Sequence, residues 1–433
     1  MDFRHIRTIT VEKLFGLYDY KLTVDSSISD NVFILYGDNG TGKSTLLKLT
    51  YHLLSSEVGQ AHKTFLANIP FRFFSIEFND GTLVAASRED ANKDFLGNYY
   101  LKYNSGEINL RCYMPCEWNE ENHMYHIRFG SSRSLLKDSL YEILEKLNNL
   151  NVFYISDNRN EGIREHMEFR HKKAISSNDP VEREMNLLHE WIVSQALESS
   201  KKGEEGTSEI YVKILEKLGK NKADERQEMT LGDISKEIDN LEIRAKSYAK
   251  MGFIPETDYT KVKEKLNKVK ISNRAPAANI LMPYIEIQKN RLDALDYLFE
   301  TVDYFVESLN NYLYKKCVVY TVNKGFEFYQ STGYGDPILN FYHDPIDIKK
   351  LSSGERQLLR LFSMVIRKSN VCPIIIIDEP EISLNIKWQR RLLSTLNYFV
   401  RKSHAQFLIA THSFEIIASH TEHTVKVGEP YLP

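Results

Sequence analysis

Eight consecutive residues near the start of the chain have the types and spacing of a phosphate-binding loop. Residues 37–44 read GDNGTGKS, which matches the pattern G-x-x-x-x-G-K-[ST]. Glycines let backbone N–H groups turn toward phosphate oxygens, Lys43 can reach the β- and γ-phosphates, and the Ser44 hydroxyl can ligate Mg²⁺. The pattern therefore predicts ATP and Mg²⁺ as ligands, with these contact residues: Gly37, Asp38, Asn39, Gly40, Thr41, Gly42, Lys43, Ser44 and Thr45.

The elements on both sides of the loop fit this chemistry. An apolar run at residues 32–36 (VFILY) predicts a strand before the loop, and the helix-forming residues 45–49 (TLLKL) follow it. The pattern needs this strand–loop–helix order, because the helix N-terminus adds its dipole to the phosphate site. A chance match in a glycine-rich turn is the alternative, and the flanking elements count against it.

An acidic pair with related chemistry lies far along the chain. Residues 374–377 are all isoleucine, and Asp378, Glu379 and Pro380 follow them. A β-branched run without polar alternation predicts a strand buried on both faces of a parallel sheet, and ligands bind at the carboxyl ends of such strands. Asp378 suits Mg²⁺, and Glu379 suits the attacking water as a general base or an orienting group.

Two further segments complete the set. Residues 351–357 read LSSGERQ and precede a helical run at 358–365, while His412 follows a second apolar run at 407–410. A histidine after a strand is more often structural when it stands alone. Together with the other segments, His412 is predicted to sense the γ-phosphate.

In this order the segments resemble the ABC-type ATPase family, in the branch that includes RecF-, SMC- and OLD-type ATPases. The resemblance covers about residues 1–160 and 316–433. It implies that Glu379 and His412 are catalytic, that Ser44 and Asp378 hold the metal, and that Ser383, Leu384 and Asn385 form the D-loop. The family often has histidine where this chain has Asn385.

The resemblance also implies a second subunit. In this family an LSGGQ signature completes the nucleotide site of the facing subunit, so a homodimer or higher homo-oligomer with head-to-tail sites is expected. Ser353 stands at the first glycine position of the signature and Glu355 at the glutamine position. The predicted contacts across the interface are Ser352, Ser353, Gly354 and Glu355.

The predicted fold is α/β: an ABC-type P-loop ATPase head with a mixed sheet, an antiparallel β-lobe and an α-helical insertion. Residues 71–78 and 82–85, joined by the turn Asn79–Asp80–Gly81, predict a hairpin in the β-lobe. The strand at 318–322 is expected to resume the sheet. The predicted modules are an N-terminal ATPase lobe (1–160), the insertion (161–315) and a C-terminal ATPase lobe (316–433).

The insertion is rich in helix formers and charges. Two forms stay open: a short coiled-coil arm as in SMC proteins, and a compact helical subdomain, which is favoured because no heptad persists for three or four repeats. Breaks are expected at 201–206 and 275–276. Helices are predicted at 182–198, 210–218, 234–250, 259–269 and 283–314.

Several residues carry two interpretations. The set Cys112, Cys116, His123 and His126 has ligand types that fit zinc, but the alternating runs 109–114 and 124–129 favour ordinary residues of a hairpin. Phe15, Tyr18 and Tyr20 could stack on adenine, although packing is favoured for each of them.

Three basic features also stay open. Arg159 could contact nucleotide or form a surface ion pair. The basic clusters at 164–173 and 387–402 could contact a phosphate backbone, but a solvated helix face is favoured for both.

Composition limits the classes of function. The net charge of −3 over 433 residues gives no general attraction to nucleic acid, so any DNA contact must be a local patch. No apolar stretch has the length of a membrane span, and the first residues lack a secretory h-region, so no membrane contact and a cytoplasmic location are predicted.

Three functions compete. A transporter subunit is disfavoured by the large insertion between the lobes. The preferred hypothesis is the ATPase of a bacterial anti-phage system, such as PARIS or Septu, that controls a separate effector, expected to be a nuclease. DNA or a phage protein are both compatible triggers. The alternative is a RecF- or SMC-like ATPase of DNA repair or chromosome maintenance.

Overall fold

The computed structural model describes residues 4–24, 31–57, 62–89, 94–128, 134–148, 150–156, 179–204, 231–270, 274–331, 345–418 and 420–428. Contacts divide the chain into two units. The first unit combines Met1–Ala174 with Met364–Pro433, and the second unit is Ile175–Ser363. The predicted boundary at 160/161 lies outside the described residues, and the three-part division stays a prediction.

A parallel sheet forms one layer of the first unit. Its described strands have the order β10-β13-β14-β3-β15, and each neighbouring pair is parallel. The strands are β10 (Val152–Ile155), β13 (Ile374–Asp378), β14 (Gln406–Thr411), β3 (Val32–Tyr36) and β15 (Thr424–Lys426). Every residue of β13 and β14 is buried, and for β13 this confirms the prediction of a strand covered on both faces.

An antiparallel sheet forms the second layer of this unit. It has the order β2-β1-β4-β5-β6-β7, and the β4–β5 pair is the hairpin predicted from the sequence. In its turn, Gly81 has a φ of 79° and Asp80 accepts a hydrogen bond from the Thr82 N–H. The strands are β1 (Ile6–Leu14), β2 (Tyr18–Thr23), β4 (Phe73–Phe78), β5 (Leu83–Ser87), β6 (Tyr99–Ser105) and β7 (Ile108–Met114).

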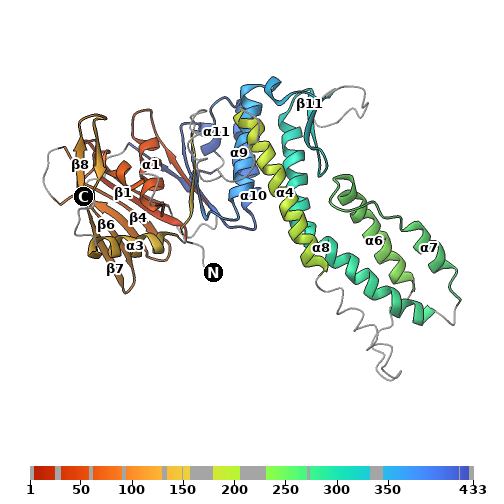
Figure 1. Ribbon diagram of the computed structural model, residues 1–433. Coiled ribbons are helices and arrows are strands. Elements are labelled where there is room, and N and C mark those ends of the chain that lie inside the picture. Colours follow the sequence, from red (N-terminus) through yellow and green to blue (C-terminus); the bar gives the residue numbers. More distant parts are fainter. Residues whose placement is uncertain are drawn as a thin grey trace. The chain divides into compact units, whose positions relative to one another are not determined.

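Helix α1 (Lys43–Leu54) lies between the two sheets, where it contacts β10, β13 and β14 on one side and β5 on the other (Figure 1). Its leucines at 46, 47, 49 and 53 are fully buried. Lys63, in α2 (His62–Ala67), donates to the carbonyls of His52, Leu53 and Ser55 at the C-terminal end of α1. Burial lowers the pKa of Lys63 to about 7.

Other elements complete the first unit. A small hairpin pairs β8 (Cys116–Asn119) with β9 (Met124–Ile127), and α3 (Ser134–Asn148) contacts β7. Helices α10 (Ile386–Val400) and α11 (Phe414–Ile417) contact one another. Gln406 joins the two halves of the unit, because its amide donates to the Ile6 carbonyl and accepts from the Ile6 N–H.

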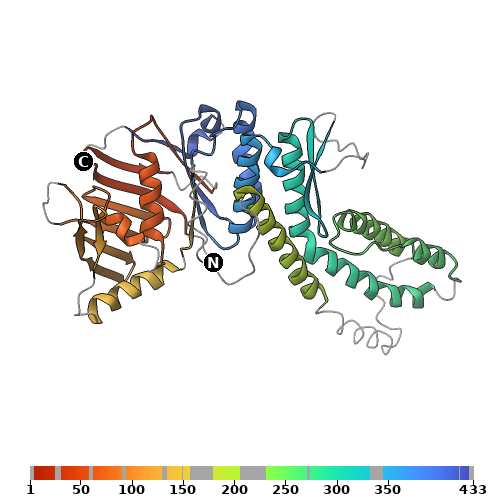
Figure 2. The same ribbon diagram turned by 45° about the horizontal axis from the view of Figure 1, so that its top comes forward.

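The second unit is mainly helical (Figure 2). Helix α4 (Pro180–Glu204) packs along α8 (Arg274–Tyr312), and α6 (Leu231–Lys250) packs on α8, where Arg244 pairs with Asp293 and Asp296. The remaining elements are α7 (Thr260–Asn267), β11 (Lys316–Thr321), β12 (Gly325–Gln330), a 3₁₀ turn at Ile348–Lys350 and α9 (Ser353–Lys368), within which the division of the units falls.

Three details of the sequence prediction are wrong. The strand at 318–322 does not resume a large sheet, because β11 pairs only with β12 among the described strands. Helix α8 begins at Arg274 rather than at 283, so the break expected at 275–276 is absent from this helix. Pro276 lies in the first turn, where a proline costs no intrahelical N–H hydrogen bond. Pro283 lies inside the helix. The runs 109–114 and 124–129 are not partners, since β7 pairs with β6 and β9 with β8.

The predicted helix 210–218 lies outside the described residues.

Candidate functional site

The predicted site residues of the first unit lie at one edge of the parallel sheet. Strands β13, β14 and β3 are adjacent and parallel, with Asp378 opposite Ala410 and Thr411 opposite Tyr36. Their carboxyl ends therefore meet at the same edge. The phosphate loop follows directly after β3 and His412 directly after β14, while Asp378 is the last residue of β13 and Glu379 follows it.

The phosphate loop depends on glycine at defined positions. Gly40 and Gly42 have φ values of 86° and 89°, which disfavour residues with a Cβ atom. A Cβ atom on Gly37 would lie 2.3 Å from the Val427 carbonyl oxygen, so only glycine lets the loop pass the segment after β15. Thr41 steadies the turn by donating from its hydroxyl to the Asp38 carbonyl over 2.9 Å.

Lys43 is buried, and its ammonium turns back onto the loop. It donates to the carbonyls of Gly37 and Asp38 at 2.7 and 2.9 Å. Loop carbonyls are neutral acceptors, and a phosphate oxygen is a stronger one because it carries negative charge. The ammonium is thus held inside the loop, among backbone groups.

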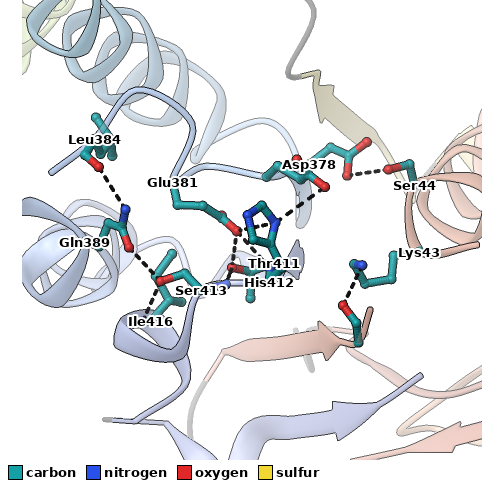
Figure 3. A network of polar contacts seen from close by, with 12 residues as sticks. Lys43, Ser44, Asp378, Glu381, Leu384, Gln389, Thr411, His412, Ser413 and Ile416 are labelled. Carbon is teal, nitrogen blue, oxygen red and sulfur yellow. Dashed lines mark hydrogen bonds and ion pairs between the residues drawn. The ribbon is translucent and has the colours of Figure 1, made fainter. Parts of the chain in front are cut away.

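Asp378 and Ser44 form the predicted metal pair, and Figure 3 shows them joined. The Ser44 hydroxyl donates to Asp378 Oδ1 over 3.0 Å, and the Tyr154 hydroxyl donates to Asp378 Oδ2 over 2.9 Å. Asp378 is buried. A carboxylate and a hydroxyl are oxygen donors that suit Mg²⁺, so the residues present fit the predicted ion.

Glu379 and His412 face one another. Glu379 has a φ of 46°, a left-handed conformation that is strained for a residue other than glycine, and Ser383 at 66° shares it. The Nδ1 atom of His412 lies 3.7 Å from Glu379 Oε1 and 3.3 Å from Glu381 Oε1. Strain beside a charged group is typical of functional sites, because the surrounding structure must hold it in place.

The signature residues lie in the second unit, at the N-terminus of α9. Ser352 and Glu355 form a capping box: Glu355 Oε2 accepts from the Ser352 N–H at 2.7 Å, and Ser352 Oγ accepts from the Glu355 N–H at 3.3 Å. Lys316 pairs with both carboxylate oxygens of Glu355. Ser352 and Ser353 are exposed, whereas Gly354 and Glu355 are buried.

Glu355 therefore holds the signature turn from inside. A carboxylate at the surface of this turn would repel phosphate, but here its charge is buried and neutralised by Lys316. Any contact of Glu355 with a nucleotide would have to come from its backbone. Arg356 adds a second tie, because it pairs with Asp179 at the start of α4 over 2.8 Å.

The residues proposed for adenine have other contacts. The hydroxyls of Tyr18 and Tyr20 donate to the carbonyls of Gly40 and Thr41, and the two rings stack 5.6 Å apart. Burial raises the pKa of Tyr20 to about 12, so its hydroxyl remains a donor. Phe15 is exposed, in a turn where its φ is 55°. Both tyrosines support the phosphate loop directly.

The cysteine and histidine set is dispersed. Cys112 is buried in β7, Cys116 lies in β8, and the His126 ring contacts Asn122. Burial raises the pKa of Cys116 to about 11, which favours the thiol. Across the described ranges, no group of three or more His, Cys, Asp or Glu side chains could hold a metal ion.

Of the basic residues, Arg390 pairs with Glu415 at 2.5 Å, and Arg401 lies over the ring of Tyr398. Asn385 caps α10 by accepting from the Trp388 N–H. Arg159 and the cluster 164–173 lie outside the described residues. The described part of the chain contains no helix with the length and apolar character of a membrane span.

Sequence reasoning missed three residues at these sites. Tyr154 orients Asp378, Glu381 contacts His412, and Lys316 neutralises Glu355. The sequence does indicate that Tyr154 and Glu381 need partners. Tyr154 places a hydroxyl in a buried parallel strand, and Glu381 is a second acid after the acidic pair. Lys316 carries no such indication, because a lysine is usually exposed to solvent and its type alone does not indicate a buried partner.

A phosphate loop, an acidic strand end and a following histidine on adjacent parallel strands define a P-loop ATPase type of fold, and the predicted α/β class is confirmed. The chain belongs to the AAA ATPase domain family AAA_15, whose model matches residues 6–417. No curated protein matches the chain.

Solved structures provide two likenesses. One is the Smc head domain with an extended coiled coil bound to the C-terminal domain of ScpA, from Pyrococcus furiosus, at 14% identity and a TM-score of 0.38. The other is the SmcHead bound to the C-winged helix domain of ScpA, at 10% identity and a TM-score of 0.35. Each comparison covers 96% of this chain and 91% of the other.

Proposed function

We propose that this protein binds ATP with Mg²⁺ at the edge of the parallel sheet and hydrolyses it to ADP and phosphate. The observation that carries the proposal is the meeting of three strand ends, which gathers Lys43, Ser44, Asp378, Glu379 and His412. Family membership independently supports a nucleotide-binding ATPase domain.

Each residue has a distinct part in this proposal. Backbone N–H groups of residues 37–45 and the dipole of α1 bind the phosphates, and the Lys43 ammonium donates to their oxygens. Ser44 and Asp378 would hold Mg²⁺, which would supply positive charge to the phosphate oxygens. Glu379 takes a proton from the attacking water, and His412 donates to the γ-phosphate.

The complete site is proposed to need a second copy of the chain. The exposed N-terminus of α9 presents the backbone of Ser352 and Ser353 and a positive dipole end, which suit a γ-phosphate. In a head-to-tail homodimer or higher homo-oligomer, this end would face the phosphate loop of the partner. ATP binding would then favour assembly, and hydrolysis would release it.

We further infer a role in anti-phage defence, in which the ATPase controls a separate effector, expected to be a nuclease. The order and types of the motifs, which resemble OLD-type ATPases, support this role. A RecF- or SMC-like ATPase of DNA maintenance is the second candidate. The packing of the long helices α4 and α8 along one another favours it, because such a pair could extend into an arm.

Glu379→Gln tests the ATPase proposal. An amide keeps the shape of the carboxylate but cannot accept a proton, so ATP should still bind while turnover falls by about a hundredfold or more. Light scattering should show a dimer that persists with ATP and Mg²⁺. Turnover within a few-fold of wild type would mean that another residue activates the water.

The cellular role needs a separate measurement. Native mass spectrometry of the protein, with and without the product of an adjacent gene, should show a complex whose stoichiometry changes with ATP. Cells that carry both genes should restrict phage, and Lys43→Ala should abolish restriction. Normal restriction by that variant would exclude ATP-dependent defence, and sensitivity to DNA damage instead would favour DNA maintenance.

A further inference from the structure

We propose that Glu381 is a positioning residue, which orients His412 toward the nucleotide, an inference that rests on the ATPase function proposed above. Glu381 lies in the turn after β13, where its carboxylate is buried. His412 lies after β14, the neighbouring strand. Figure 3 shows the Glu381 side chain reaching from the turn to this strand end.

A single oxygen of Glu381 holds the segment that carries His412. Oε1 accepts hydrogen bonds from the Thr411 hydroxyl at 2.7 Å and from the His412 N–H at 2.8 Å. The same oxygen lies 3.3 Å from His412 Nδ1. The carboxylate thus fixes the backbone of His412 and faces one nitrogen of its ring.

The second oxygen indicates why the residue is an acid. Oε2 of Glu381 is buried and makes no hydrogen bond within the described part of the chain. An unpaired buried carboxylate oxygen costs free energy, so hydrogen bonding to Thr411 and the backbone alone does not explain a charged group here. The carboxylate instead acts on the His412 ring. A carboxylate beside Nδ1 favours the tautomer that carries its proton on that nitrogen, and it fixes the orientation of the ring.

Gln389 provides a neutral comparison in the same network. Its amide donates to the Leu384 carbonyl at 2.8 Å and accepts from the Ser413 hydroxyl at 2.7 Å. It therefore ties the same two segments together without facing the His412 ring. If joining the segments were sufficient, loss of Gln389 would affect His412 as much as loss of the Glu381 charge.

A double-mutant cycle tests the proposal. Glu381→Gln in the full chain should lower kcat about ten- to a hundredfold, the range for losing a charged hydrogen-bond partner, with little change in KM. In the His412→Ala background, the same substitution should change kcat by less than about threefold, because its effect passes through the ring. Equal losses in both backgrounds would overturn the proposal.

The second measurement needs no nucleotide. In protein labelled with ¹⁵N-histidine, the ring resonances of His412 are assigned by their loss in His412→Ala. Glu381→Gln should shift the Nδ1 resonance of His412. Gln389→Met is the matched control and should leave that resonance in place. The comparison is made between variants with the same thermal midpoint of unfolding. An unchanged Nδ1 resonance in Glu381→Gln would exclude the positioning role. If the wild-type protein hydrolysed no ATP, the proposed function would fail, and this spectrum would still decide the role of Glu381.

Discussion

The sheet edge of the first unit and the signature turn of the second unit are built in opposite ways. At the sheet edge, His412 Nδ1 lies 3.7 Å from the Glu379 carboxylate, and two residues other than glycine, Glu379 and Ser383, have left-handed backbone. At the signature turn, Glu355 is buried, capped and paired, and none of the described residues 345–363 has a positive φ.

The difference between the sheet edge and the signature turn indicates what each contributes to the protein: chemistry in one case, stability and assembly in the other. Strain of about 1–3 kcal/mol per residue persists only where the surrounding structure maintains it, so the sheet edge is expected to serve chemistry at the expense of stability. The signature turn satisfies its own groups and offers backbone donors and a helix dipole. Substitutions at the edge should therefore change ligand binding and turnover first, and those that open the signature turn should change stability or assembly first.

The largest effect is expected from Lys43→Ala. The phosphate loop loses the cation of its motif, and ATP affinity measured by calorimetry should fall at least about a hundredfold. Lys48→Ala, which changes a lysine further along α1, is the control and should bind ATP normally. Equal affinity of Lys43→Ala and wild type would contradict the assignment of the loop.

Ser352→Arg tests the signature turn. The bulky side chain should spare ATP binding but lower hydrolysis at least about tenfold, because it keeps the turn away from a facing phosphate. Mixing this variant with Lys43→Ala should restore some activity through one intact composite site.

A crosslink gives a direct test of the same arrangement. Cysteines placed at Ser352 and Asn39, in a chain depleted of other cysteines, should join two different chains, and ATP should increase the yield. Crosslinks confined to single chains would contradict a head-to-tail dimer.

Lys316→Met should reduce stability more than it reduces nucleotide binding. The substitution leaves the buried Glu355 carboxylate without its cation, which should lower the free energy of unfolding by about 2 kcal/mol. Lys324→Met is the matched control, because Lys324 is exposed and lies 3.7 Å from Glu327. Similar denaturant midpoints for the two variants would show that the buried pair does not stabilise the turn.

Tyr154→Phe should have the smallest effect. It removes the hydroxyl that donates to Asp378, so the Mg²⁺ concentration for half-maximal activity should rise by about tenfold or less. ATP affinity measured in EDTA should stay unchanged. A shift in that affinity would place Tyr154 in nucleotide binding instead.

Local sequence patterns predicted the elements that make up most of the first unit. The isoleucine run became a fully buried strand, and the Asn79–Asp80–Gly81 turn joined β4 to β5. These signals succeeded because burial and turn chemistry are local properties. The prediction that β11 joins the large sheet was wrong. An apolar strand is equally suited to a large sheet and to an isolated hairpin, so its sequence does not specify its partner.

The candidate site was predictable in its motif residues and not in its supporting contacts. Lys43, Asp378 and His412 stand in recognisable segments, whereas their roles stay predictions until tested. The hydrogen bonds of Tyr154 to Asp378 and of Lys316 to Glu355 join residues 224 and 39 positions apart. Such pairs follow from the three-dimensional fold, so no local pattern in the sequence could specify them.

The order of strands in the parallel sheet also constrains how the chain can fold during synthesis. Strand β3 has β14 and β15 as its neighbours, so both of its partners are made after the whole second unit. Until residue 426 has left the ribosome, the strand that carries the phosphate loop lacks its complete pairing. Nascent chains should therefore stay unable to bind nucleotide while the antiparallel sheet, whose strands all precede residue 115, can already form.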